Sequence, residues 1–233
     1  MIIQNLHAWN VTPQEAIALQ KQLASQIITQ DCLSDTISYI AGADVALEGA
    51  TMIHAAVVIM TYPELRIIET QCHQQELTMQ YIPGLLSFRE IPVLLEAFKK
   101  VQQKPDLIMV DGMGIAHQRG IGIASHLGLW LQIPTIGVGK TRLVGTYHAD
   151  ELGNEKGSTV ALMYHEKMIG GVVRTKTNVK PLFISPGHMV SVKTSIDYVL
   201  ACSRGYRLPE PTRYADKLSK KDPTLHNNDM CRG

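Results

Sequence analysis

The sequence predicts a single α/β domain built on one mixed sheet, and two features carry that prediction. Three strand-like segments follow one another in the N-terminal half, with a Tyr62-Pro-Glu64 turn before the third. Further on, a strand, a Gly-rich loop, a helix and a second strand occur in that order over residues 106–137. Such an order joins two parallel neighbours by a right-handed crossover. A length of 233 residues is enough to bury one sizeable core.

The first expected element is a helix over residues 13–30. Thr12-Pro-Gln-Glu15 has the form of a capping box with Pro at the first helical position, and apolar residues recur after it at helical spacing. The three strand-like segments that follow are rich in apolar and β-branched residues. We expect these strands over residues 37–47, 53–62 and 65–72. Together they predict a hairpin or meander that leads into the crossover unit.

The middle of the chain supplies the crossover. Residues 81–88 are expected to be irregular because Pro83 and Gly84 interrupt them. A helix over roughly 90–102 has an apolar face and ends before Lys104-Pro105. The crossover unit itself is expected as a strand, a helix and a strand over residues 106–110, about 120–131 and 133–137. The strands that carry Asp44 and Asp111 would then lie in the middle of the sheet.

The C-terminal third predicts three more strands and one more helix. The strands are expected near residues 159–164, 167–174 and 181–185. Gly187 is expected to break the chain before a last helix over about 191–203. A basic segment then runs to Lys221. We expect one domain over residues 1–222 and a polar, disordered tail over residues 223–233.

Charge and composition exclude several classes of protein. The formal net charge is +1, so the chain lacks a strong positive field and any nucleic-acid surface must be local. No apolar run approaches the length of a membrane span, and the N-terminus lacks the order of a secretory signal. The four cysteines form no C-x-x-C pair and no zinc-site spacing. These features predict a cytoplasmic protein without membrane contact.

Three carboxylates occur where a charge is hard to bury. Asp44 lies within a strand-like apolar segment, Asp111 ends the run Asp106-Leu-Ile-Met-Val-Asp111, and Glu90 follows the irregular segment. An unpaired carboxylate in an apolar interior costs several kcal/mol, and no Lys or Arg stands beside Asp44 or Asp111 in the sequence. A divalent cation would compensate these charges. Acids on adjacent strands are a usual way to hold Mg²⁺ against a phosphate.

Each of the three acids also has a structural explanation. Asp44 could be a buried acid bonded to backbone amides, and Asp111 could form a turn before Gly112. Glu90 could complete a capping box with Ser87, although Pro92 would then lie deep for a first helical turn.

Two nucleotide-binding motifs are incomplete. Gly137-Val-Gly-Lys-Thr141 resembles half of a P-loop, but Pro134 occupies the position of the first required glycine. Lys140 is then either a solvated lysine or a lysine that leaves a strand end near the acids and touches a phosphate. Asp111-Gly-Met-Gly-Ile-Ala-His117 lacks the third glycine of a dinucleotide fingerprint, and its acid comes first. The sequence therefore indicates neither a P-loop nor a Rossmann site.

Six segments, in order along the chain from about residue 1 to about residue 220, are similar to those of one enzyme family. They are Ala41-Gly-Ala-Asp44, Tyr81-Ile-Pro-Gly-Leu-Leu-Ser-Phe-Arg-Glu90, Asp111-Gly-Met-Gly-Ile-Ala-His117, Gly122-Ile-Ala-Ser-His126, Ile133-Pro-Thr-Ile-Gly-Val-Gly-Lys140 and Leu208-Pro-Glu-Pro-Thr-Arg213. Together they resemble endonuclease V, the deoxyinosine 3′-endonuclease of DNA repair. The long Tyr-Ile-Pro-Gly segment is highly specific, whereas Asp-Gly-x-Gly alone would not be.

The resemblance implies a ribonuclease H-like fold, which is a mixed central sheet flanked by helices on both faces. It implies hydrolysis of the second phosphodiester bond 3′ to a deaminated base, leaving a 3′-hydroxyl and a 5′-phosphate. The implied cofactor is Mg²⁺, with Mn²⁺ able to substitute. The implied partner is DNA that contains deoxyinosine or another deaminated base. We also expect the protein to be a monomer.

The resemblance also assigns roles by position. Asp44 and Asp111 match the metal-binding aspartates of the family, and Glu90 matches its third acid. Lys140 matches the lysine near the scissile phosphate. Asp216 matches a fourth site position of the family. His117 is not assigned by the resemblance; it lies in the loop beside Asp111 and is either catalytic or merely polar. Both are included in the expected catalytic set, as residues that could position a water or a metal.

The lesion itself is expected to meet the loops around the glycines. Tyr81 matches the tyrosine that wedges into the strand where the damaged base leaves, although as a residue it could equally be a packed loop aromatic. Glycine lets the backbone approach the edge of a base closely. The expected lesion-binding residues are Tyr81, Ile82, Pro83, Gly84, Arg89, Gly112 and Gly122.

The sequence departs from the family pattern at a few positions. Gln80 stands where the family usually has Pro, so the wedge loop is expected to be less rigid. Asp216 stands where some members have His, and an acid suits a Mg²⁺ site better than an imidazole does. Two rival functions remain open: a ribonuclease that acts on inosine in RNA with the same site, and a non-catalytic nucleic-acid-binding module that needs no metal.

Overall fold

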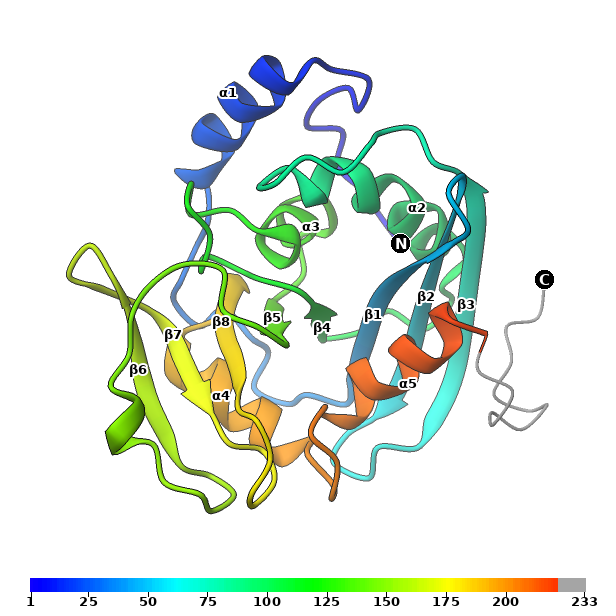
Figure 1. Ribbon diagram of the computed structural model, residues 1–233. Coiled ribbons are helices and arrows are strands. Elements are labelled where there is room, and N and C mark those ends of the chain that lie inside the picture. The colour runs from blue at the N-terminus through cyan, green and yellow to red at the C-terminus, as the bar shows by residue number, and fades with distance from the viewer. Residues whose placement is uncertain (222–233) are drawn as a thin grey trace.

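The computed structural model describes residues 1–221 and contains one eight-stranded sheet (Figure 1). The strand order is β3-β2-β1-β4-β5-β8-β7-β6. The strands are β1 Tyr39–Glu48, β2 Met52–Thr61, β3 Ile67–Glu76, β4 Leu107–Asp111, β5 Thr135–Gly139, β6 Thr159–Tyr164, β7 Lys167–Val173 and β8 Leu182–His188. The expected tail over residues 223–233 and the domain boundary at residue 222 lie outside the described residues.

The sheet is mixed, as predicted. The first three strands form an antiparallel meander, while β1, β4 and β5 run parallel to one another. The last three strands return to antiparallel pairing. The predicted parallel crossover between β4 and β5 is confirmed, and so is the placement of both acid-bearing strands in the middle of the sheet.

Helices cover both faces of this sheet (Figure 1). They are α1 Pro13–Ala24, α2 Leu86–Lys100, α3 Ile123–Leu131, α4 Val192–Ala201 and α5 Glu210–Ser219. Helices α2 and α3 bury apolar side chains against one face of β1, β2 and β4. The other face packs against α4 near β4, β5 and β8, and against α5 near β2. The predicted site residues lie on the central strands, on α2 and α5, and on the loops that join these elements.

Two helix boundaries differ from the prediction. Helix α1 ends at Ala24 instead of continuing to residue 30, because the backbone of Ile28 bonds to His188 and Met189 at the end of β8. Helix α2 begins at Leu86, four residues before the predicted start, so Ser87 lies inside the helix and forms no capping box with Glu90. Pro92 is tolerated within α2.

The C-terminal prediction was wrong in two respects. Gly187 does not break the chain, because β8 continues through it to His188. The helix expected over about 191–203 is not the last one, because the basic segment after it contains α5, whose Ala215 and Leu218 pack on Ala56, Val58 and Met60 of β2. A helix whose stability comes mainly from such packing leaves little local signal in its sequence.

Two further features bear on the predicted character of the protein. Within residues 1–221, no helix has the length and apolar character needed to cross a membrane. Cys72 on β3 is disulfide-bonded, which the isolated cysteines of the sequence did not predict.

Candidate active site

The parallel register of β1 and β4 brings two predicted aspartates together. Ala43 is paired with Val110, so the next residues on the two strands, Asp44 and Asp111, lie side by side. Since side chains alternate between the faces of a strand, both carboxylates leave the face opposite to Ala43 and Val110. That is the face covered by α5.

Helix α5 brings a third aspartate to the same place. Carboxylate oxygens of Asp44, Asp111 and Asp216 all lie within 4.8 Å of one another. Ser219, one turn further along α5, donates a hydrogen bond of 2.6 Å from its Oγ to Oδ2 of Asp44. Three carboxylates this close repel one another unless a cation lies among them, and hard oxygen ligands suit Mg²⁺ or Mn²⁺.

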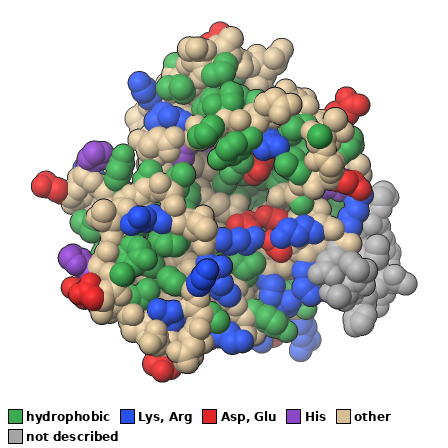
Figure 2. Space-filling model, viewed as in Figure 1, with side chains coloured by type: hydrophobic (Ala, Val, Ile, Leu, Met, Phe, Trp, Pro, Cys, Tyr) green, Lys and Arg blue, Asp and Glu red, His purple; other side chains and the backbone are tan. Residues whose placement is uncertain are grey.

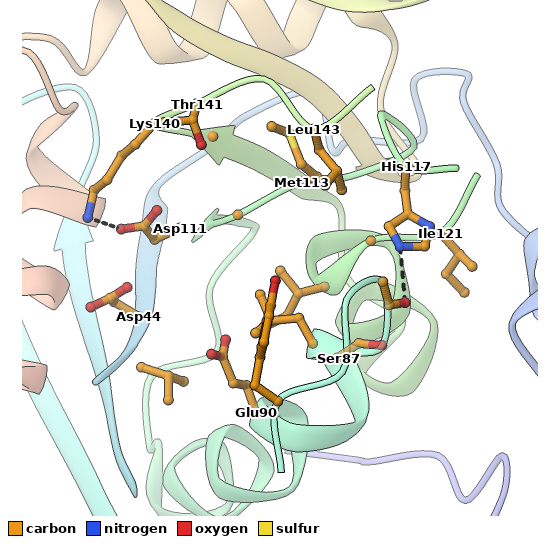
Figure 3. A pocket seen from close by; sticks show the side chains of 18 of the residues that line it. Asp44, Ser87, Glu90, Asp111, Met113, His117, Ile121, Lys140, Thr141 and Leu143 are labelled. Carbon is orange, nitrogen blue, oxygen red and sulfur yellow. Dashed lines mark hydrogen bonds and ion pairs between the residues drawn. The ribbon is translucent and has the colours of Figure 1, made fainter. Parts of the chain in front are cut away.

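Lys140 partly supplies the missing positive charge. It follows β5, as predicted, and its Nζ forms an ion pair with Asp111 (Figure 3). A second ion pair, at 2.5 Å, joins it to Asp216. Burial alone would lower the pKa of Lys140, but the two aspartates outweigh it and raise the pKa. Burial would likewise raise the pKa of Asp216, yet its hydrogen bonds from Lys140 and Lys220 hold the pKa below its ordinary value.

The negative charges of Asp44 and Glu90 are not balanced by neighbouring positive charge. Burial, followed by the charge of Asp111, raises the pKa of Asp44 to about 7. Burial, followed by the charge of Asp44, raises the pKa of Glu90 to about 8. Glu90 comes from α2 on the opposite layer and extends toward the same pocket, although it is not one of the three tightly grouped carboxylates (Figure 3). Both side chains would gain from a bound divalent cation.

A cavity of about 360 Å³ is lined by the acids on one side. Gly84, Gly112 and Gly122 line it, as the sequence predicted for a base pocket. A Cβ at Gly122 would lie 2.3 Å from the carbonyl oxygen of Met113, so only glycine fits there. The size of the cavity and the close approach of backbone at these glycines suit a flat ring.

The wedge loop stands at the rim of this cavity. Tyr81 is 59% exposed, and its ring lies 5.9 Å from the guanidinium carbon of Arg89. Ile82 packs instead into a small apolar cluster with Ala16 and Phe88. Tyr81 is therefore not a packed loop aromatic but a free ring at the mouth of the pocket, while Ile82 anchors the loop that carries it.

His117 lines the pocket but faces away from the acids (Figure 3). Its Nε2 lies 3.2 Å from the carbonyl oxygen of Gly84, and its Nδ1 accepts the backbone N–H of Arg119 at 3.2 Å. Because a carbonyl only accepts, the ring carries its proton on Nε2. Burial lowers the pKa of His117 to about 4, so the ring is neutral at pH 7. Both of its nitrogens serve the loop, which leaves none directed at the aspartates.

The rim of the site is basic. Figure 2 shows acidic side chains at the floor of a hollow, with Lys and Arg side chains on either side of them. Some of these cations also hold the protein's own backbone: Arg207 donates to the carbonyl of Lys140, and Arg213 pairs with Glu210. Although the net charge of the chain is close to zero, positive side chains thus gather locally around the site.

Sequence reasoning missed Ser219 as a site residue. A serine in a segment that was not recognised as a helix carries no signal of its own. The spacing of Asp216 and Ser219 would have placed both on one helical face had α5 been predicted. Gln20 and Arg119, which contact the wedge loop, were also missed.

Comparison with known proteins adds independent findings. A family model of Endonuclease V matches residues 21–217. The endonuclease V of Nostoc punctiforme is 51% identical to this chain over 214 residues, which span 91% of this chain and 96% of the relative.

Solved structures agree in fold. The structure of the Endonuclease V from Streptomyces avermitilis matches with a TM-score of 0.86 at 34% identity, over 95% of this chain and 97% of the other. Ciona intestinalis Endonuclease V, in complex with a 24mer DNA containing an inosine followed by a ribo-adenosine, matches with a TM-score of 0.78 at 27% identity, over 90% and 96% of the two chains. The ribonuclease H-like architecture expected from the sequence is confirmed.

Proposed function

The chain belongs to the Endonuclease V family and is thus a nuclease, and from that premise we propose that it repairs DNA by cutting beside deaminated bases. The proposed substrate is DNA with deoxyinosine, and the proposed cut is at the second phosphodiester bond 3′ to the lesion, leaving a 3′-hydroxyl and a 5′-phosphate. The observation that carries the proposal is the grouping of Asp44, Asp111 and Asp216 within 4.8 Å at a cavity lined in part by Gly84, Gly112 and Gly122. The first feature suits hydrolysis of a phosphodiester and the second suits an extruded base.

The proposed cofactor is Mg²⁺, with Mn²⁺ able to substitute. Asp44, Asp111 and Asp216 would hold the cation, and Glu90 would contribute from the opposite layer. These donors fit the cation, because all four are carboxylates. The pKa values of Asp44 and Glu90 are raised, and a bound cation would lower them. Bound Mg²⁺ supplies a water of lowered pKa and offsets the negative charge that develops on the phosphate.

The remaining roles follow from position. Lys140 has its Nζ at Asp111 and Asp216, so it is placed to hold a phosphate oxygen by charge. Tyr81, exposed at the rim, would fill the gap in the strand left by the extruded base. Arg89 lies over that ring, and Ile82 anchors the loop that carries it. Gly84, Gly112 and Gly122 line the cavity and would admit the base edge to the backbone. For Pro83 we propose the lesion contact expected from the sequence. We propose that the protein acts on DNA as a monomer and in the cytoplasm.

The proposal is tested by a nicking assay on a labelled duplex with one deoxyinosine, in Mg²⁺ or EDTA. Wild type should cut once, at the second phosphodiester bond 3′ to inosine, and only with Mg²⁺. Asp111→Asn keeps the size of the side chain but removes its charge, and it should abolish cutting while retaining DNA binding in a gel-shift assay. Asp150→Asn, at an exposed position far along the chain, is the matched control and should cut normally.

Two results would change the assignment. Asp111→Asn cutting at nearly the wild-type rate would disprove the metal site. A chain that leaves the duplex intact but cuts the matching inosine RNA would be a ribonuclease. The ribo-adenosine in the Ciona intestinalis complex makes that second substrate worth including.

A further inference from the structure

Three side chains from two distant segments converge on a single backbone carbonyl, that of Gly84. Nη2 of Arg119 donates to it at 2.6 Å, Nε2 of Gln20 at 3.0 Å and Nε2 of His117 at 3.2 Å. Nε of Arg119 also donates to Oε1 of Gln20 at 2.6 Å. The three donors are therefore linked to one another as well as to Gly84. A carbonyl with three partners, one of them charged, is held firmly.

Burying a polar side chain costs free energy, and Gln20 is buried in this cluster. Gln20 lies on the apolar face of α1 between Ala16 and Leu23 and is only 1% exposed. A polar group buried this far is tolerated only with its hydrogen bonds made, and here both ends of the amide are used. Among residues 1–221, no carboxylate forms an ion pair with Arg119, whose donors go to neutral oxygens. An apolar residue at position 20 would satisfy the packing of α1, but it would leave Gly84 with fewer partners.

The carbonyl that these residues hold belongs to the wedge loop. Within the described residues, no other hydrogen bond joins the backbone of residues 78–84 to a distant segment; the carbonyl of Ile82 bonds only locally, to Leu85. Gly84 has a φ of +80°, in the left-handed region that favours glycine, and a Cβ there would meet Gln118 and Arg119. Apart from the packing of Met79 and Ile82 in the small apolar cluster, the loop is held by the hydrogen bonds of Gln20, His117 and Arg119 to Gly84.

We infer that Gln20, His117 and Arg119 form a clasp that holds the wedge loop in place over the pocket and thereby sets selectivity for the extruded base. This inference rests on the proposed function. The three are positioning residues that act through Gly84 and touch neither the phosphate nor the metal site. By holding the loop before the substrate arrives, the clasp spares the complex the entropy of ordering Tyr81 and the pocket wall during base extrusion. It also offsets the flexibility expected from Gln80.

The clasp is tested first without substrate, by ¹⁵N relaxation of the Gly84 amide. Wild type should give an order parameter typical of rigid backbone, about 0.85, and Gln20→Ala should lower it toward the flexible range below about 0.6. Arg119→Lys keeps the positive charge on the half-exposed surface but lacks the planar fork that reaches Gly84 and Gln20 together, so it should behave like Gln20→Ala. Gln22→Ala, at an exposed position of the same helix, is the control and should match wild type. Gly84 remaining rigid in Gln20→Ala and Arg119→Lys overturns the clasp.

The second measurement compares cutting of inosine-containing and undamaged duplexes. In Gln20→Ala and Arg119→Lys, kcat/KM on inosine should fall roughly tenfold or more, while cutting of undamaged DNA and the Mg²⁺ concentration for half-maximal rate stay unchanged. A merely unstable variant would lose activity on both duplexes alike. Unchanged selectivity with a mobile Gly84 overturns the role in recognition. Wild type that does not cut inosine DNA overturns the proposed function instead, and the relaxation data still decide whether the clasp exists.

Discussion

At the scale of single residues, Asp44 shows how a local environment sets the chemistry of the site. Its side chain is 7% exposed and lies on a central strand. Within residues 1–221 its one hydrogen bond comes from Ser219, while burial and the charge of Asp111 keep its pKa near 7. Ser219 occupies one oxygen of the carboxylate and so leaves the other free for a cation. Partners that orient a metal ligand in this way are a large part of a metal site.

Removing that partner should weaken metal binding. Ser219→Ala takes away the hydrogen bond that lowers the pKa of Asp44, so protons should compete better with Mg²⁺. We expect the Mg²⁺ concentration for half-maximal cutting to rise roughly tenfold, within the 10–100-fold range known for such partners. Titration of Mg²⁺ in the nicking assay, and of Mn²⁺ by calorimetry on the free protein, would measure it.

The control for Ser219 is a second buried serine near a helix end. Ser203→Ala removes an Oγ that donates to the carbonyl of Val199, and Ser203 does not line the cavity of the acids. Both variants should lose comparable stability, but only Ser219→Ala should change metal affinity. Equal metal affinity in the two variants would show that Ser219 has no part in the site.

At the scale of elements, the site depends on how closely α5 approaches β1. Gly42 lies under the start of α5, and a Cβ there would be 1.9 Å from the carbonyl oxygen of Pro211. That distance is impossible without moving the helix. Because α5 carries both Asp216 and Ser219, the glycine two residues before Asp44 sets the spacing of the acids as well as the packing of the helix.

A methyl group at Gly42 should therefore disturb the site from a distance. Gly42→Ala is expected to cost about 1–3 kcal/mol in the free energy of unfolding, the usual cost of overpacking a well-packed core. It should also weaken Mg²⁺ binding, since α5 must move outward and carry Asp216 away from Asp111. Denaturant unfolding and metal titration would measure the two effects.

Gly153→Ala is the matched control for Gly42→Ala. Its new Cβ would lie 3.2 Å from Oγ of Ser158, the end of a side chain that can shift. It should lose little stability and bind Mg²⁺ normally. Wild-type metal affinity in Gly42→Ala would mean that α5 tolerates the displacement and that the close approach has no role in the site.

At the scale of the whole molecule, two helical layers meet at the carboxyl ends of the parallel strands. Asp44, Asp111 and Lys140 come from the central sheet, Asp216 from α5 on one face, and Glu90 from α2 on the other. Helices on both faces of the sheet thus place carboxylates beside those of the central strands. In the metal-free protein that charge is under-compensated, so folding and metal binding should be linked through pH.

The linkage has a definite direction. The pKa values of Asp44 and Glu90, about 7 and about 8, lie above their ordinary values of 3.8 and 4.5. The folded chain therefore binds more protons than the unfolded chain, and metal-free stability should fall as pH rises from about 4 to about 8. A bound cation replaces those protons, so stabilisation by Mg²⁺ should grow over the same range.

Thermal melting with and without Mg²⁺ would measure this effect. The gain in melting temperature should be small near about pH 6 and several degrees near about pH 8.5. The double variant Asp44→Asn, Glu90→Gln should show little gain at either pH, because its side chains do not titrate. A gain that is the same at both pH values would contradict the raised pKa values.

Some of this site could be predicted from the sequence because its signals are local. The acids Asp44 and Asp111 were recognisable because each lies in or beside an apolar strand, where an uncompensated charge is costly. The crossover between β4 and β5 followed from the order of strand, loop and helix, and it placed both acids in the middle of the sheet. Lys140 was recognisable as a cation at the end of a strand in that same unit.

By itself, then, the sequence determined the mixed sheet, the pair of central aspartates and, through its motifs, the family. Only the tertiary structure decided that α5 exists as a helix, that Ser219 bonds to Asp44 across 175 positions, that Glu90 approaches from the opposite layer, and that His117 holds Gly84 instead of facing the acids. The physical reason is the range of the interactions. Periodicity and capping act between neighbours along the chain, whereas α5, the buried Gln20 and the clasp on Gly84 are stabilised by packing and hydrogen bonds between segments that meet only after folding.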